Sequence, residues 1–395
     1  MATFLSLPPS VLAAVFLLLP SFATAQKDNA KECSCFVTNE TSSGYFTSHR
    51  FFDFRNVASA PATAPAIISS LPNTTNAFYS SDYFTKDTWK DDWTIQNWTS
   101  SDSMVTSDAT ILMANSLSNV YLEKSDDADP SYTSHLTLRT SRQPDFQSVA
   151  EFDSVEQNFQ YLSARFMARV IGSPGACAGM FTYLANDDPQ LVQEADIEIL
   201  TSGPRNVVQY TNQPAVDADG NEKPEATVNG TQPRDWSEWN VYRVDWMPKS
   251  TSWYVNGNSV AKIEFQVPKD PAGLMVNMWS NGGSWTGNMS TFDEAFLQIQ
   301  WIELVYNTSG PYGGSGAKKR DTDDIGFSGP LEKRKKKQQG CKVVCSIDEQ
   351  VNVTGTPAVL SNNTAAAPLG WKGEGMGFMA WMPLFLISGT AFGYL

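Results

Sequence analysis

The five residues Glu194-Ala195-Asp196-Ile197-Glu198 alternate charged and apolar side chains without interruption. A period of two is typical of a β-strand, in which successive side chains point to opposite faces of a sheet. We therefore expect Glu194, Asp196 and Glu198 on one face, and Ala195 and Ile197 against a core on the other. Three like charges on one strand face repel one another, so the pattern adds little to the stability of a fold.

The carboxyl groups of this strand suit a reaction that needs two acids in different protonation states. Glycoside hydrolysis is the usual case, because one carboxylate attacks the sugar or activates water while a carboxylic acid protonates the leaving oxygen. An acidic strand face that serves only solubility is the alternative, and the five residues alone do not exclude it. Residues four apart on a flat strand have Cα atoms about 13 Å apart, so the side chains must lean together over a concave sheet to act on one bond.

Short β-type segments surround this strand, and no long segment has the 3.6-residue period of a helix. Asn256-Gly257 separates two of them and predicts a β-hairpin, because the tight turn needs positive φ at both central positions. Many short strands over about 280 residues predict an all-β sandwich in which one large curved sheet backs another. The other segments are 136–139, 166–171, 207–210, 241–246, 253–255 and 274–278.

The two ends of the chain read as targeting signals. Residues 11–19 are apolar and are followed by the small residues Ala23-Thr24-Ala25, which predicts a signal peptide over 1–25 and a mature chain from Gln26. A polar spacer and an apolar stretch, 376–395, follow small residues near Asn363, a pattern typical of a glycosylphosphatidylinositol (GPI) attachment signal. We expect attachment at Asn363, removal of 364–395, and a secreted protein anchored by lipid to the cell surface or wall; a transmembrane helix is the alternative.

Between these signals we expect one globular unit, 26–310, and a flexible Cys-containing linker, 311–363. The linker holds the dibasic pairs Lys319-Arg320 and Lys333-Arg334, which are either a solvated charged stretch or processing sites. A formal net charge of −14 disfavours nucleic acid and anionic lipid as ligands and suits a neutral polymer such as a glucan.

Secretion gives meaning to the cysteines and to the Asn-x-Ser/Thr sequons. Cys33 and Cys35 are too close to bridge each other easily, so Cys341 and Cys345 are their expected partners, with the connectivity open, and Cys177 is left as a buried thiol. The chain has two histidines, which disfavours a Ser-His-Asp triad or a His-rich zinc site, and no acidic loop matches a Ca²⁺ site. We expect no cofactor, and a structural Ca²⁺ without a recognisable motif is the alternative. Glycosylation is expected at Asn39, Asn73, Asn97, Asn229, Asn288, Asn307, Asn352 and Asn362.

Four segments, read in order, carry a family resemblance: 179–183 (Gly-Met-Phe-Thr-Tyr), the Glu194 motif, 239–257 with its three tryptophans, and 277–285 (Asn-Met-Trp-Ser-Asn-Gly-Gly-Ser-Trp). Together they resemble glycoside hydrolase family 16 over roughly 84–306. The resemblance implies a concanavalin A-like β-jelly-roll with a sugar-binding cleft across its concave sheet, and retaining chemistry on β-glucans. Members with this motif include lichenase-like β-glucanases and fungal transglycosylases that join chitin to glucan, and the anchor signal favours the second group.

By motif position, the resemblance implies that Glu194 is the nucleophile, Glu198 the acid/base, and Asp196 the residue that keeps their pKa values apart. Trp279 and Trp285 resemble cleft aromatics on which sugar rings stack, although Trp279 in an apolar strand could equally be core. Tyr183 is a further candidate for substrate contact. Asn240 stands where family members often carry His, and it can hydrogen-bond but not titrate.

The sequence thus predicts a monomeric, retaining glycosidase that acts on β-1,3 or β-1,3/1,4 glucan. Transglycosylation of glucan, with chitin as a candidate acceptor, passes through the same intermediate and is the first alternative. A lectin-like binder and an anchored structural glycoprotein are the others. Retention of all three acids disfavours the binder, and the aromatic, strand-patterned centre disfavours the stalk.

Overall fold

A computed structural model describes residues 32–38, 44–61, 63–71, 78–100, 105–106, 108–128, 131–309, 341–348 and 355–361. The expected signal peptide, the attachment signal with Asn363 and both dibasic pairs lie outside these residues, as do the sequons at Asn39, Asn73, Asn352 and Asn362.

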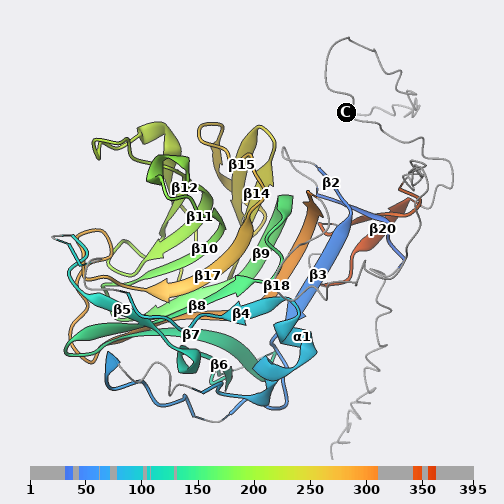
Figure 1. The fold of residues 1–395 in the computed structure, drawn as a ribbon. Coiled ribbons are helices and arrows are strands. Elements are labelled where there is room, and N and C mark those ends of the chain that lie inside the picture. The colour runs from blue at the N-terminus through green and yellow to red at the C-terminus, as the bar shows by residue number, and fades with distance from the viewer. Residues whose placement is uncertain are drawn as a thin grey trace, which may run out of the picture.

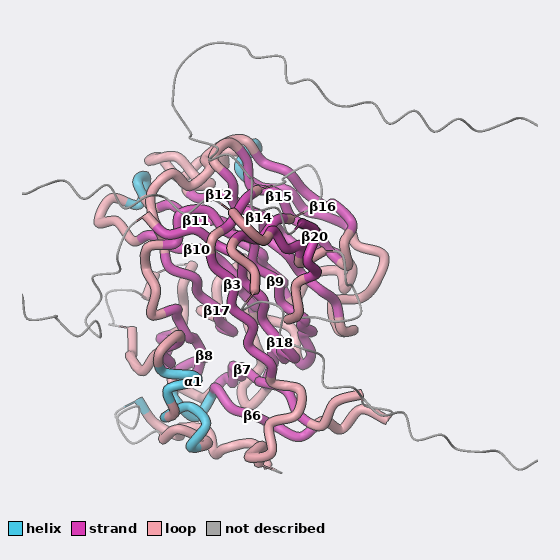
Figure 2. Tube along the Cα trace, turned by 90° about the vertical axis from the view of Figure 1, so that its right-hand side faces the viewer, coloured by secondary structure: helices cyan, strands magenta, loops and turns pink. Residues whose placement is uncertain are grey.

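Most of the described residues form one large, mainly antiparallel sheet that folds back on itself into two layers (Figure 1). The first layer is ordered β13-β12-β11-β10-β17-β8, and the path continues through β7-β18-β9-β14-β15-β16. Strand β8 belongs to both layers, because residues 150–153 pair with β17 and residues 147–148 pair with β7. This arrangement confirms the predicted all-β sandwich, and Figure 2 shows how little of the described part of the chain is helical.

The strands of the first layer are β13 (Thr227–Thr231), β12 (Val207–Gln213), β11 (Gln193–Leu200), β10 (Cys177–Leu184), β17 (Gly273–Trp279) and β8 (Phe146–Ser154). Those of the second are β7 (Ser134–Arg142), β18 (Glu294–Thr308), β9 (Phe159–Gly172), β14 (Asn240–Met247), β15 (Ser250–Val255) and β16 (Asn258–Ile263). Four more strands and a short helix flank them: β3 (Ser48–Asp53), β4 (Trp93–Ile95), β5 (Leu112–Asn115), β6 (Val120–Lys124) and α1 (Asp87–Lys90).

Apolar side chains from the two layers meet in the core. Ala195 and Ile197, the apolar members of the alternating motif, are fully buried. Tyr210 of the first layer lies 5.7 Å from Trp253 of the second, measured between ring centroids. Burying each such large side chain contributes roughly 1.5–3 kcal/mol. The core therefore fixes which face of β11 points inward, and the acidic face must point out.

The predicted hairpin is confirmed, because Asn256 and Gly257 join β15 to β16 with φ values of 50° and 79°. Both values are positive, as the tight primed turn requires. The described part of the chain contains no helix whose length and apolar character would suffice to cross a bilayer.

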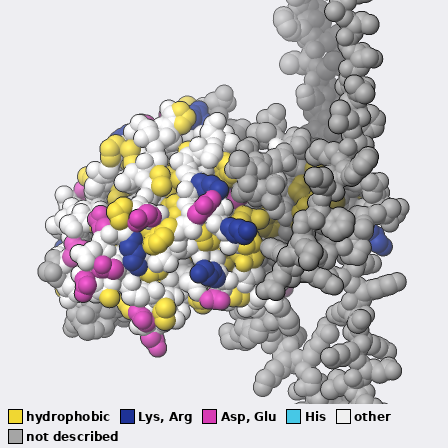
Figure 3. All heavy atoms as spheres, turned by 90° about the horizontal axis from the view of Figure 1, so that it is seen from above, with side chains coloured by type: hydrophobic (Ala, Val, Ile, Leu, Met, Phe, Trp, Pro, Cys, Tyr) yellow, Lys and Arg dark blue, Asp and Glu magenta, His cyan; other side chains and the backbone are white. Residues whose placement is uncertain are grey.

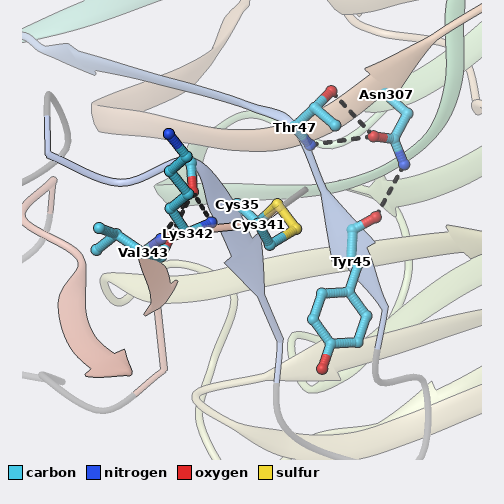
Figure 4. The surroundings of a disulfide bond; sticks show 8 residues. Cys35, Tyr45, Thr47, Asn307, Cys341, Lys342 and Val343 are labelled. Atoms are coloured by element: carbon cyan, nitrogen blue, oxygen red, sulfur yellow. Dashed lines mark hydrogen bonds between the residues drawn. A yellow bond between two sulfur atoms is a disulfide. The ribbon is translucent and has the colours of Figure 1, made fainter. Parts of the chain in front are cut away.

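Part of the expected linker is folded. Strands β19 (Val344–Ser346) and β20 (Ala358–Ser361) join β1 (Cys35–Val37) and β2 (Tyr45–Phe46) in a second sheet, ordered β2-β1-β19-β20. Two disulfides, Cys33–Cys345 and Cys35–Cys341, tie the strands together, and Figure 4 shows the second. Residues 341–348 and 355–361 thus belong to the folded body. Strand β19 pairs with β1 of the N-terminal segment, and β20 pairs with β19, which gives both hydrogen-bond partners that the local sequence does not reveal.

This small sheet is also held to the large one by buried charges. Asp348 contacts two arginines of the second layer, Arg165 on β9 and Arg243 on β14. We call these three residues the C-terminal clamp. Arg243 also donates two hydrogen bonds to Asp245, at 2.7 and 2.6 Å. Oε1 of Glu303 lies at hydrogen-bonding distance, 3.0 Å, from Nε2 of His49 on β3.

Candidate active site

The three carboxyl groups lie on strand β11. This strand is not at the edge of the first layer, because β10 pairs with it on one side and β12 on the other. Glu194, Asp196 and Glu198 alternate with the buried apolar residues and share the face away from the core. We call them the cleft trio. Because both edges of β11 are hydrogen-bonded, the strand holds the trio on a rigid support.

Residues directly opposite on neighbouring strands share a face, so the surroundings of the trio follow from the register. On β10 the opposing residues are Tyr183, Phe181 and Gly179, and on β12 they are Gln213, Thr211 and Gln209. The β10 side is thus mainly aromatic, whereas the β12 side offers amides and a hydroxyl.

Burial governs the ionisation of the trio. It raises the pKa of Glu194 to about 7, against a hydrogen bond with Asp196 that lowers it. Burial, followed by the charges of Glu194 and Glu198, raises the pKa of Asp196 well above its usual value. Burial and the charge of Glu194 raise that of Glu198 to about 8. None of the ion pairs among the described residues includes a member of the trio, so no cation offsets the loss of hydration.

Gln213 orients the middle acid. Its side-chain oxygen accepts a 2.8 Å hydrogen bond from the backbone N–H of Ala215, which turns its amide nitrogen towards Asp196, at 3.3 Å from Oδ2. A protonated Asp196 can then donate to Glu194 while accepting from Gln213. No sequence pattern marked Gln213, because its role depends on the β11–β12 register.

A pocket of about 680 Å³ opens beside the trio, on the β12 and β13 side. Trp279 and Trp285 form its aromatic wall. Their ring centroids are 5.8 Å apart, and the angle between the ring planes is 25°. Trp285 is 38% exposed and donates a 3.2 Å hydrogen bond through Nε1 to Gln209, the residue opposite Glu198. The other lining residues are Glu194, Glu198, Thr211, Gln213, Ala215, Val216, Glu222, Lys223, Pro224, Thr227 and Asn229.

The structure brings Tyr183 to the trio but not Asn240. Tyr183 lies opposite Glu194, and burial together with the charge of Glu194 raises the pKa of its hydroxyl. Asn240 is fully buried on β14, in the second layer, where it donates 2.9 Å hydrogen bonds to the carbonyls of Asp235 and Glu238. The expectation of a substrate contact at Asn240 is therefore corrected: its amide fastens a loop, because β14 is not a strand of the cleft.

The described sequons differ in their surroundings. Asn97 and Asn288 are exposed, whereas Asn307 accepts hydrogen bonds from Thr47 and donates one to the carbonyl of Tyr45 (Figure 4). Asn229 is exposed and lines the pocket. A glycan on Asn229 would therefore compete for space with any ligand of the trio.

Cys177 is free and fully buried on β10, opposite Leu200 and Trp279. It shares the outward face with Gly179, beside the aromatic wall. Burial, with the charges of Glu198 and Asp196, raises its pKa well above the ordinary value, so the thiol stays protonated.

A second acid pair on this face was missed from the sequence. Glu151 and Asp153 of β8 lie opposite Asn277 and Met275 of β17. Burial and the charge of Glu151 raise the pKa of Asp153 to about 8, and Gln96 donates a 2.6 Å hydrogen bond to it. Glu151-Phe152-Asp153 has the same alternation as the Glu194 motif, which was the available signal. Among the described residues, no three His, Cys, Asp or Glu side chains are grouped so that they could hold a metal ion.

Comparisons with known proteins agree with this architecture. The family model described as "Glycosyl hydrolases family 16" matches residues 97–303, just over half of the chain. The β-glucanase of Bacillus licheniformis is 29% identical over 136 residues, 33% of this chain and 52% of that protein, and the β-glucanase of Bacillus subtilis is 26% identical over 135 residues, with the same two coverages. The chain thus spans about half the length of these curated relatives.

Alignments with solved structures have lower identity. The B. licheniformis β-glucanase structure aligns with 20% identity and a TM-score of 0.41, covering 55% of this chain and 92% of that one. The endo-β-1,3-glucanase of Pyrococcus furiosus aligns with 15% identity and a TM-score of 0.41, covering 55% and 90%.

Proposed function

Since the chain belongs to glycosyl hydrolases family 16, we propose that it is a retaining glycosidase acting on β-glucan, with β-1,3 or mixed β-1,3/1,4 linkages. The observation that carries the proposal is the cleft trio: three carboxyl groups on one strand face, beside a pocket with an aromatic wall, with raised pKa values and no cationic partner among the described ion pairs.

The trio supplies both steps of the reaction. Glu194 attacks the anomeric carbon in its carboxylate form, which a hydrogen bond from protonated Asp196 favours against burial, while Glu198 gives its proton to the leaving oxygen. The raised pKa of Glu198, about 8, leaves it protonated at neutral pH for this step. In the second step ionised Glu198 takes a proton from water, the hydroxide oxygen bonds to the anomeric carbon, and the bond to Glu194 breaks.

The lining of the pocket supports a neutral sugar polymer as substrate. Trp279 and Trp285 offer flat apolar faces, and Gln209, Thr211 and Asn229 offer groups that hydrogen-bond hydroxyls. Lys223 is the one basic residue of the described lining, and it already donates to Gln190 and to the carbonyl of Pro214. On the face seen in Figure 3, basic and acidic side chains are interspersed, so this face presents no large field of one sign.

Transfer to a sugar acceptor is the second candidate. It is favoured by the extent of the pocket, which continues from the trio across β12 to β13. A second carbohydrate, such as a glucan or chitin chain, held there could resolve the glycosyl-enzyme in place of water.

We further propose that the protein is secreted and held at the cell surface by a lipid anchor at Asn363, the reading favoured by the pattern of small residues, spacer and apolar stretch. Treatment of cells with a phosphatidylinositol phospholipase should release it. Complete resistance to the phospholipase would contradict the anchor.

The activity is tested on the full chain, produced in a secretory host, with laminarin, lichenan and chitin oligomers. A fluorescent sugar acceptor is added to half of the reactions, and Glu194→Gln is the control. Shortened oligosaccharides alone would mean hydrolysis, with the consumed substrate naming the linkage. Label entering polymer would mean transfer. Binding of a glucan without any product would contradict both and favour a lectin-like protein.

A further inference from the structure

The aromatic wall depends on a loop rather than on a strand. Trp285 lies in the loop 280–287 that leaves β17, and its ring is held by the stack on Trp279 and by one hydrogen bond to Gln209. Gly282 and Gly287 adopt φ values of 71° and 83°, which only glycine takes readily, so the loop follows a defined path.

A distant segment, 108–111, braces this loop. Oδ1 of Asp108 accepts hydrogen bonds from the backbone N–H of Ser284, at 3.0 Å, and from its hydroxyl, at 2.7 Å. The hydroxyl of Thr110 donates to the carbonyl of Gly282 at 3.1 Å, and the N–H of Ile111 donates to the carbonyl of Asn281 at 3.0 Å. The bonded residues of segment and loop are 170–176 positions apart in sequence, so this is a tertiary contact that neither piece forms alone.

The contact is close as well as hydrogen-bonded. A Cβ atom added to Gly283 would lie 1.8 Å from the carbonyl oxygen of Asp108, and one added to Gly282 would lie 2.6 Å from the side chains of Thr110 and Ile111. Backbone therefore packs on backbone, with no room for a side chain between them. Asp108 bonds the residue directly before Trp285, so a shift of this contact moves the ring.

We propose that Asp108 is a positioning residue for carbohydrate binding: its carboxylate fixes Ser284 and thereby holds the Trp285 ring stacked on Trp279, in the pocket that Glu198 also lines. The proposal rests on the proposed function in that the ligand is a β-linked neutral sugar chain whose ring stacks on this wall. Asp108 itself lines no part of the pocket, so it acts through Trp285 and not by contact.

The chemistry of the brace sets the design of the variants. The hydrogen bonds from Ser284 lower the pKa of Asp108, so it remains an ionised acceptor at neutral pH. One oxygen accepts both bonds, so Asp108→Asn keeps the acceptor while Asp108→Ala removes it. Ser284→Ala keeps the backbone bond and loses the hydroxyl bond. Asp145→Ala is the matched control, an exposed carboxylate in the turn between β7 and β8.

The first measurement needs no ligand. Hydrogen–deuterium exchange over 280–287 should rise in Asp108→Ala, rise less in Ser284→Ala, and match the parent chain in Asp108→Asn and Asp145→Ala. Exchange that is unchanged in Asp108→Ala would overturn the proposal, whatever the protein proves to catalyse.

The second measurement is the effect on sugar. Asp108→Ala should raise the KM for glucan by about 3–10-fold with little change in kcat, the loss expected when a stacking ring is misplaced. In a Trp285→Ala background the same substitution should add nothing, because its effect runs through the ring. Equal effects of Asp108→Ala in both backgrounds would overturn the proposal. If the chain turns over no glucan, the same comparison is made on binding constants from tryptophan fluorescence. A failure of the proposed reaction is then distinguished from a failure of the positioning role of Asp108.

Discussion

Buried carboxyl groups occur in two regions of this molecule, and their surroundings are opposite. In the cleft trio, Glu194, Asp196 and Glu198 have one another as neighbours, and none takes part in a described ion pair. In the C-terminal clamp, Asp348 contacts Arg165 and Arg243, with side chains only 14%, 10% and 6% exposed. Both regions bury carboxyl groups, on strand β11 in the trio and just after strand β19 in the clamp, but only the clamp supplies cations.

The difference separates an acid kept for chemistry from an acid kept for structure. Without a cation, burial penalises the charged form and raises the pKa values in the trio. In the clamp, burial alone would lower the pKa of Arg243, but the charge and hydrogen bonds of Asp245 and the charge of Asp348 raise it, so the arginine stays charged. The trio should therefore lower the free energy of unfolding and be required for activity. The clamp should raise the free energy of unfolding and not be required for activity. Four experiments test this contrast.

The largest expected effect is the loss of turnover in Glu194→Gln. Removing the nucleophile should lower kcat on glucan by on the order of 10⁴-fold, while the melting temperature stays equal to or above that of the parent chain. Product release and thermal melting are measured on the same preparation. Turnover within tenfold of the parent chain would show that Glu194 is not the nucleophile.

Removing one disulfide should weaken the small sheet that carries Asp348. The pair Cys35→Ser and Cys341→Ser should lower the free energy of unfolding by about 2–4 kcal/mol, because the closed loop no longer restricts the unfolded chain. Urea unfolding followed by tryptophan fluorescence measures it. Cys177→Ala, which touches no disulfide, is the control, and a control loss as large as that of the pair would contradict the assignment.

Asp348→Ala removes the acid of the clamp and leaves two arginines without it. We expect a loss of about 3 kcal/mol, at the low end of the range for breaking a buried pair, because Arg243 keeps Asp245. Turnover at 25 °C should be unchanged. An activity loss without a stability loss would break the contrast, since the clamp lies outside the pocket lining.

The smallest effect is a gain in stability from Glu198→Gln. The pKa of Glu198 rises from 4.5 to about 8 on folding, so between these values the folded chain binds more protons than the unfolded one. The free energy of unfolding must therefore fall as pH rises through this window. Gln does not titrate, so the variant should be more stable than the parent chain at pH 8 by on the order of 1–2 kcal/mol and equal at pH 4.

Thermal melting at the two pH values measures this, with a shift of about 2–4 °C per kcal/mol expected. Asp145→Asn, an exposed acid, is the matched control and should give equal melting temperatures at both pH values. A parent chain whose stability does not fall between pH 5 and 8 would contradict the raised pKa values.

The alternation in the sequence predicted much of the site. A period of two requires Glu194, Asp196 and Glu198 to share a face, and burial of the apolar residues between them determines which face points to the core. The same rule applied to Glu151-Phe152-Asp153 would have found the second acid pair on this face of the sheet. Asn256-Gly257 likewise predicted its own turn, because both residues readily adopt the positive φ that the turn requires, whatever the rest of the fold.

Tertiary structure decided what local chemistry leaves open. Asn240 reads as a polar residue in a strand, and only the order of strands puts β14 in the layer without the cleft. Gln213 and Asp108 gain their roles from partners at a distance in the sequence: the register of β11 with β12 for the first, and the packing of 108–111 on the Trp285 loop for the second. The folding of 341–348 depends on cysteines some 300 residues earlier.

The sequence by itself therefore determined the strands, their faces and the acids that one face exposes, because side-chain direction follows from backbone geometry and burial from polarity. The fold decided which of those faces form one cleft, which buried acids meet an arginine, and which loop holds the aromatic wall. Those outcomes depend on contacts between residues far apart in the chain, and no local pattern encodes a distance between them.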